Sequence, residues 1–292
     1  FLRFLSNLLI YFNSEDSSDT YVEVLKAFCT TFRSLQPAIL PVFSFAWLEL
    51  ISHRMFMPRL LMSPSKGAFQ HLLVDLFKFL YPYLRTAELT DPIKRLYRGT
   101  LKILLVLLHD FPEFLSEYHF SLCDAIPPSC IQMRNLILSA FPRQMKLPDP
   151  LTPNLKVDLL PEISLAPNIL SDYTSILTKY GVKDGLDTFL ESRQPATFVD
   201  DLKLKVCVST EEALETGTGY NVPLMNALVL YVGVETINMR SRGVMTPMVS
   251  SPSTHLFFRL LTELDTEGRY MLLNALANQL RYPNNHTHYF SC

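Results

Sequence analysis

LKILLVLLHDFPEFLSEYHFSLCDAIPPSCIQMRNLILSAFP, from Leu101 to Pro142, is the stretch that decides the fold. Its first turns are so apolar that between residues 101 and 108 only Lys102 carries a charge. A helix that is apolar nearly all round is buried on several sides, so we expect this one at the centre of a helical stack. Pro112 and the pair Pro127 and Pro128 fit the first turns of the following helices, where the missing proline N–H costs nothing.

The chain before this stretch also shows helical patterns. Thr20 and Glu23 have capping-box spacing, which predicts a helix start after a polar loop over residues 13–19. Further apolar stripes predict a helix that ends before Pro37, one that opens at Pro41, one that closes near Pro82 and one capped by Asp91 with Pro92 at its first position. Consecutive helices with short turns are typical of stacked helical pairs, although no repeat of fixed period is visible.

Six prolines between Pro142 and Pro167 mark the clearest change along the chain. Proline at this density excludes a helix. Leucine, valine and isoleucine alternate with the prolines, so the segment differs from a flexible glycine and serine linker. We therefore divide the chain into an N-terminal helical half at 1–142, a proline-rich extended connector at 143–167 and a C-terminal helical half at 168–292.

The C-terminal half again reads as helices. They are predicted at residues 168–180, 183–193, 197–205, 222–238, 254–264 and 266–280, the last capped by Asp265. Two polar segments, 209–221 and 239–253, are predicted to be mobile or disordered loops. The expected fold is all-α: HEAT-like stacked antiparallel helix pairs, an α-solenoid, in two packed halves. Neither end carries a clear capping or stop signal, so we expect a piece cut from a longer chain.

Composition favours a protein that buries many of its residues in a core or under partner chains. Of 292 residues, 48% are hydrophobic and 18% charged, and the formal net charge is −2, which gives no general attraction to nucleic acid. Five scattered cysteines without a C-x-x-C pair indicate buried free thiols of a reducing compartment, the cytoplasm or the nucleus. No uninterrupted apolar run approaches the roughly 18 residues of a membrane span.

Residue patterns for catalysis, cofactors or metals are weak. His286 and His288 lie two residues apart with no carboxylate or cysteine at ligand spacing, so we favour ordinary histidines over a metal site. Adjacent helical residues such as His109 and Asp110 point about 100° apart, and no nucleophile elbow accompanies them. The 217–219 turn lacks the lysine of a phosphate loop. We predict no catalytic, cofactor-binding or metal residues, and no enzyme.

A partner surface is the remaining functional expectation. Aromatic residues surround the Pro112 corner, and leucines line the proline-rich strip, where an extended partner would find apolar contacts. The residues predicted to bind a partner are Phe111, Phe114, Tyr118, Phe120, Leu147 and Leu151. For any single aromatic ring, a place in the core is the favoured interpretation and the partner surface is the alternative.

Several long stretches identify a family. They are AWLELISHR (46–54), LLVDLFKFLYPYLR (72–85), LVLLHDFPEFLSEYHFSLCDAIPPSCIQMRNLILSAFP (105–142), LPDPLTPNLKVD (147–158), NALVLYVG (226–233) and LDTEGRYMLLNALANQLRYPNNHTHYFSC (264–292). Together they resemble the C-terminal homology domain of the Not-one scaffold subunit of the Ccr-Not deadenylase complex, and the resemblance covers nearly the whole chain.

This resemblance implies a HEAT-like, non-catalytic scaffold without a cofactor. The domain would dock the Not-box subunits, a heterodimer whose extended segments wrap it, and short peptides of RNA-binding repressors. It would thereby support mRNA deadenylation, decay and translational repression in the cytoplasm and also the nucleus, with no direct nucleic-acid or membrane binding. The alternative is a helical-repeat RNA-binding or transport-adaptor module, which needs a stripe of lysine and arginine along one face. A hydrolase would need a convergent polar pocket, which no residue pattern supplies.

Overall fold

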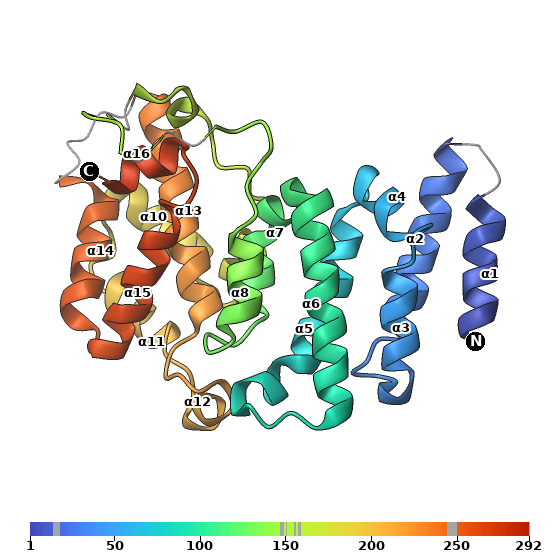
Figure 1. The fold of residues 1–292 in the computed structure, drawn as a ribbon. Helices are drawn as coiled ribbons and strands as arrows, with labels where there is room; N and C mark the ends of the chain where they lie inside the picture. Colours follow the sequence, from blue (N-terminus) through green and yellow to red (C-terminus); the bar gives the residue numbers. More distant parts are fainter. Residues whose placement is uncertain are drawn as a thin grey trace. The chain divides into compact units, whose positions relative to one another are not determined.

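The structure is a computed structural model, and it describes residues 1–13, 18–146, 149, 151–154, 156, 159–243 and 250–291. Within these ranges the regular elements are helices, and an isolated bridge between Cys207 and Tyr220 is the nearest approach to a strand (Figure 1). The predicted all-α class is confirmed.

The chain divides into two compact units. Unit 1 comprises Phe1–Leu147 with Ile169–Ser171, and unit 2 comprises Pro148–Asn168 with Asp172–Cys292. The helices of unit 1 are α1 (Leu2–Asn13), α2 (Ser18–Ser34), η1 (Pro41–Phe43), α3 (Ser44–Ile51), α4 (Met57–Met62), α5 (Gly67–Thr86), α6 (Asp91–Asp110), α7 (Pro112–Asp124) and α8 (Ile131–Leu138). Those of unit 2 are η3 (Pro161–Ser164), α9 (Tyr173–Lys179), α10 (Lys183–Ser192), α11 (Phe198–Lys205), α12 (Thr210–Thr216), α13 (Val222–Ser241), α14 (Pro252–Glu263), α15 (Thr266–Asn278) and α16 (Asn285–Ser291).

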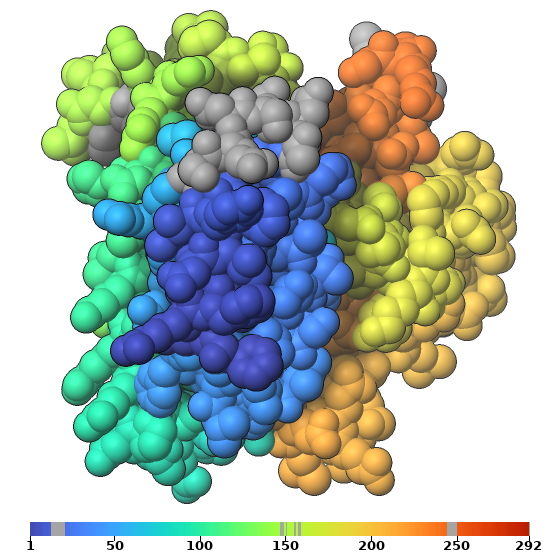
Figure 2. All heavy atoms as spheres, turned by 90° about the vertical axis from the view of Figure 1, so that its right-hand side faces the viewer, coloured from blue at the N-terminus to red at the C-terminus, as the bar shows by residue number. Residues whose placement is uncertain are grey.

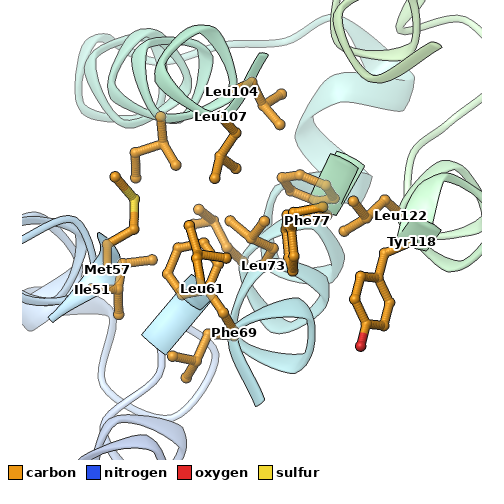
Figure 3. Packing of buried hydrophobic residues seen from close by; sticks show 14 of the residues in the cluster. Ile51, Met57, Leu61, Phe69, Leu73, Phe77, Leu104, Leu107, Tyr118 and Leu122 are labelled. Atoms are coloured by element: carbon orange, nitrogen blue, oxygen red, sulfur yellow. The ribbon is translucent and has the colours of Figure 1, made fainter. Parts of the chain in front are cut away.

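The core of unit 1 forms where α5 and α6 meet their neighbours. Phe69, Leu73 and Phe77 recur every four residues along α5, so they line one side of that helix and all three are fully buried. In Figure 3, Leu104 and Leu107 of α6 point towards the same cluster. Helix α6 also packs against α3, α7 and α8. The apolar stretch that begins at Leu101 thus lies at the centre of unit 1.

Helix α6 corrects one prediction, because it is not buried all round. Its buried side chains, Leu96, Thr100, Ile103, Leu104 and Leu107, follow the spacing of a single helical face. On the opposite side Leu105 is 51% exposed and Val106 is also exposed. The physical reason is that neighbouring helices cover only one side, and the charged residues earlier in α6 fix which side faces water.

Unit 2 is organised around α13. Seven consecutive residues, Ala227–Gly233, are buried, because α9, α15 and α16 pack around this helix. By length and composition alone, α13 is the described helix that is long and apolar enough to cross a membrane, but most of it lies inside unit 2. The buried helix predicted from NALVLYVG is confirmed, with its end three residues later, at Ser241.

The predicted loop over residues 209–221 is wrong, since it contains helix α12. The Ser209 side chain accepts a hydrogen bond from the Glu212 backbone N–H at 3.2 Å, which caps the first turn. Glu211 and Glu212 add negative charge where the helix dipole favours it. Gly217, at φ 80°, ends the helix in the left-handed conformation. The segment is polar, but it contains the residues that begin and end a helix.

Proline positions account for other boundary errors. Helix α5 continues through Pro82 to Thr86. Pro82 has no N–H for the carbonyl of Lys78, but both residues are exposed, so water can bind that carbonyl. Pro127 and Pro128 lie in a turn before α8, which begins only at Ile131. Pro112 does open α7, as predicted.

Several other starts shift by a few residues. Helix α2 begins at Ser18 rather than Thr20, and Thr90 rather than Asp91 is the N-cap of α6. Helix α9 begins only at Tyr173, because the Asp172 side chain accepts a hydrogen bond from the Ser175 N–H and sets the start there. Asp265 caps α15 through the Gly268 N–H at 2.8 Å, as predicted.

The proline-rich connector contains turns and the 3-10 helix η3 in its described part. Residues 147, 148, 150, 155, 157 and 158 of the connector lie outside the described residues, as do 14–17 and 244–249 of the predicted loops. Cys29, Cys123 and Cys130 are buried cysteines, whereas Cys207 is exposed, contrary to expectation. Cys292 lies outside the described residues.

Candidate partner-binding surface

The predicted aromatic corner is a tight junction between α6 and α7. Phe111 ends one helix and precedes the next: its N–H donates to the Leu107 carbonyl at 2.9 Å, and its carbonyl accepts from the Phe114 N–H at 3.1 Å. Pro112 takes the first position of α7, where no hydrogen bond is lost. Two backbone hydrogen bonds and a proline therefore define the turn between α6 and α7.

Arg143 fixes the start of the connector to this junction. Its guanidinium donates to the carbonyls of His109 and Asp110 at 2.8 and 2.9 Å, and its backbone N–H donates to a Glu113 carboxylate oxygen at 3.2 Å. Charged hydrogen bonds to the last carbonyls of a helix complement its dipole. The connector therefore leaves the corner in a defined position.

The structure places most of the predicted aromatic contacts in the core. Phe114 packs against Phe69 and Tyr118, with ring centroids 5.8 and 5.0 Å apart, and Phe114 and Tyr118 are both buried. Phe120 is buried as well, whereas Phe111 is only half-buried. Three of the four rings thus stabilise unit 1 and offer little surface, and partner binding at these positions stays a prediction.

The two predicted leucines of the connector have different outcomes. Leu151 is 85% exposed and belongs to unit 2, whereas Leu147 lies outside the described residues. Leu159 and Leu165 of unit 2 are exposed in the same way, while Ile163 between them is buried. The described part of the strip therefore carries apolar side chains at the surface.

Helix α7 is also held in place by polar contacts. Glu117 pairs with Lys66, and its carbonyl accepts the Leu170 N–H at 3.0 Å. The Ser121 N–H donates to the Ser171 hydroxyl at 3.2 Å. Burial, and secondarily the Glu117 charge, raises the pKa of Tyr118 above its usual value. These polar contacts fix α7 within unit 1.

Sequence reasoning missed a second apolar surface, over residues 38–45. Ile39, Val42 and Phe45 are exposed there, with Val42 at 92%, while Trp47, two residues after Phe45, is fully buried. The signal was present in the sequence, because no charged residue occurs between Arg33 and Glu49. Exposed apolar patches of this kind mark interaction sites in soluble proteins.

The histidines singled out in the sequence do not assemble a site. His286 is 1% exposed, its Nδ1 lies 3.0 Å from Gln279 Oε1, and burial lowers its pKa to about 4. His109 Nδ1 and Asp110 Oδ1 do meet, at 2.7 Å, but both side chains are exposed at the end of α6. Among the described residues no group of three histidine, cysteine or acidic side chains is placed to hold a metal ion.

Unit 2 contains a cavity of about 280 Å³ between α10, α13 and the start of α14. Its lining includes Glu191, Arg240 and Arg242, together with the buried Ser251 and Ser253. The two serine hydroxyls lie 2.9 Å apart, and the Tyr289 hydroxyl donates to Ser253 at 2.8 Å. These hydroxyl groups bind one another, so they serve the packing of α14 and α16.

Comparison with known proteins identifies the family. A family model described as "CCR4-Not complex component, Not1" matches residues 9–292. The chain is 44% identical over 284 residues to the CCR4-NOT transcription complex subunit let-711 of Caenorhabditis elegans. This alignment covers 92% of this chain and 11% of that protein. It is 34% identical over 304 residues to general negative regulator of transcription subunit 1 of Schizosaccharomyces pombe, covering 100% of this chain and 14% of that protein.

Two solved structures share the fold over 99% of this chain. The NOT1 superfamily homology domain from Chaetomium thermophilum has a TM-score of 0.85 at 30% identity, and 59% of it is covered. A Not1 C-terminal domain solved in complex with Not4 has a TM-score of 0.79 at 28% identity, and 61% of it is covered. The chain spans only about a tenth to a seventh of its curated relatives. With the family model matching almost all of it, the chain belongs to the Not1 family of CCR4-Not complex components.

Proposed function

We propose that this chain is a scaffold domain that binds other protein subunits of the CCR4-Not complex. The observation that carries the proposal is the similarity, over 99% of the chain, to a Not1 C-terminal domain that was solved in complex with Not4. A domain of the same fold and family therefore binds a protein partner directly, and this chain has the same helical framework on which to do so.

In the finer form of the proposal, the domain is a HEAT-like array of antiparallel helix pairs that docks a Not-box heterodimer and short peptides of RNA-binding repressors. It acts without catalysis or a cofactor, in the cytoplasm and nucleus, to support mRNA deadenylation, decay and translational repression. Direct contact with RNA or a membrane is not part of this function.

The surface chemistry supports the proposal. Exposed apolar side chains occur in groups, over residues 38–45, on the outer side of α6 and along the connector. Long extended partners bind through many such separate contacts, because each buried apolar side chain contributes about 1.5–3 kcal/mol before the cost of ordering. A surface with several apolar groups fits a wrapping partner better than a single compact one.

Co-purification tests this function. The chain is expressed together with a Not-box heterodimer, and the mass of the purified complex is determined. A stable assembly with one copy of each chain is the expected result. If the chain is folded, as its helical circular dichroism and cooperative melting would show, and yet elutes alone, the scaffold proposal fails for this segment.

A further inference from the structure

The outer face of α6 combines charged and apolar side chains in one row. Arg95, Arg98, Lys102, Leu105 and Val106 follow one another at intervals of three, four, three and one residues, which places them on one side of the helix. All five are exposed, and the buried side chains of α6 lie on the opposite side. We refer to these five residues as the outer face of α6. In Figure 2, turquoise side chains from this part of the chain project along the left edge of the molecule.

The three cations of the outer face have no acidic partner among the described residues. The nearest acidic residue in the helix, Asp91, lies 3.9 Å from Lys94, and Asp110 at the other end pairs with His109. Surface cations usually occur among carboxylates of the same protein. Three neighbouring cations without one generate a local positive potential that attracts a negatively charged partner.

The apolar end of the outer face limits the kind of partner. Leu105 and Val106 lie about 10 Å along the helix from Arg98, because each residue advances the helix by 1.5 Å. Single-stranded RNA is bound by aromatic stacking platforms beside the cations. The outer face supplies two aliphatic side chains instead, which match an apolar side chain of a peptide. Its chemistry therefore favours an acidic peptide over RNA.

We propose that the outer face of α6 docks an acidic segment of a partner protein. Carboxylates of that segment contact the three cations. An apolar side chain of the same segment covers Leu105 and Val106, which lie about two helical turns beyond Arg98. This inference rests on the proposed scaffold function, because it names the chemistry of one partner segment and the place where it binds. The neighbouring helices hold the backbone of α6 in place, so that on this side of the interface only side chains lose freedom on binding.

A fluorescent peptide tests the proposal on the full chain. The probe has about 16 residues, enough to span the face as a helix, with three glutamates on one side followed by two leucines. Its control carries glutamine in place of glutamate. We expect saturable binding of the acidic peptide, at least tenfold weaker binding of the control, and weaker binding in 1 M salt, where charges are screened beyond about 3 Å.

Matched variants locate the binding. Arg98→Glu combined with Lys102→Glu is expected to weaken the acidic peptide at least tenfold, and Leu105→Ser at least threefold. Lys156→Glu combined with Lys179→Glu makes the same charge change at exposed positions of unit 2 and is expected to leave binding unchanged. Because the mutated side chains are exposed, the melting temperature of each variant should match that of the parent chain.

Three results would overturn the proposal. The first is equal binding of the acidic and control peptides by the parent chain. The second is undiminished binding of the acidic peptide by the variant that combines Arg98→Glu with Lys102→Glu. The third is that the parent chain binds an oligouridylate probe but not the acidic peptide, and that the variant no longer binds the oligouridylate. Retained co-purification of the same variant with the Not-box heterodimer would show that the scaffold function stands without this site. If the parent chain itself failed to co-purify with the Not-box heterodimer, the scaffold function would be refuted.

Discussion

Helices α6 and α13 have the same length, 20 residues, and both contain a long aliphatic run, yet they are used in opposite ways. Helix α13 is buried on all sides over Ala227–Gly233, with its charged residues confined to its C-terminal half. Helix α6 buries one side and presents the other, because Arg95, Arg98 and Lys102 must remain in water. The placement of charge, more than the number of leucines, decides whether such a helix forms a core or a surface.

Truncation of leucines is the most disruptive way to test this comparison. Leu104→Ala in α6 and Leu228→Ala in α13 each remove a fully buried side chain, so each should cost about 2–5 kcal/mol of the free energy of unfolding. Urea denaturation followed by circular dichroism measures the change. A cost below about 1 kcal/mol at Leu228 would mean that α13 is not the packed centre of unit 2.

Acid should weaken the surroundings of α13 through His286. Burial lowers the pKa of this histidine to about 4 in the folded chain, against about 6.5 when unfolded. The unfolded chain therefore takes up the proton first, and stability falls as the pH drops from about 6.5 to 4, by about 1.4 kcal/mol per pH unit and about 3 kcal/mol in all.

The control for this pH effect is His286→Gln, which does not titrate but keeps a side-chain hydrogen-bond donor for Gln279. Its free energy of unfolding, measured by urea titration at several pH values, should vary less between pH 6.5 and 4 than that of the parent chain. Parallel curves for the two proteins would show that His286 is not held neutral by the fold.

A smaller effect is expected where α16 approaches α13. A Cβ atom added at Gly233 would lie 2.8 Å from a Phe290 ring carbon and 2.9 Å from a His286 ring carbon, so both rings must move. Overpacking of this kind costs typically 1–3 kcal/mol, and the better helix propensity of alanine returns about 1 kcal/mol. Gly233→Ala should therefore destabilise the chain by about 1 kcal/mol in thermal melts, and a more stable variant would contradict this close packing.

The smallest effect is expected at the outer face of α6. Leu105→Ser removes an apolar side chain that is half in water, so the free energy of unfolding should change by no more than about 0.5 kcal/mol. Leu104→Ala and Leu105→Ser therefore compare a buried and an exposed side chain within one helical turn. Equal costs at the two positions would mean that α6 is covered on both sides.

The sequence predicted the elements that carry strong local signals. The apolar run of α13, the Asp265 cap of α15 and the helix opened by Pro112 could all be predicted, because each depends on neighbouring residues. Helix α12 was missed because polar composition outweighed its serine cap and its glycine stop. Pro82 predicts a helix end from its residue type, yet α5 continues past it, because Pro82 and Lys78 lie on the exposed side of the helix.

The candidate surface was harder to predict, because exposure depends on which helices pack together. The aromatic residues of α7 look the same in sequence whether they face a partner or the core, and the structure turns Phe114 and Tyr118 towards Phe69. The outer face of α6 was missed for the converse reason: Leu105 belongs to a leucine run, and only the helices around it show which leucine remains uncovered.

Hydroxyl-radical footprinting with mass spectrometry is the most direct test of this contrast. In the folded chain, Leu105 and Val106 should be oxidised at rates typical of exposed aliphatic side chains, while Leu104 and the Ala227–Val232 segment should stay at least tenfold slower until urea unfolds the protein. Equal protection of Leu104 and Leu105 would contradict the account, because α6 would then have no face left for a partner.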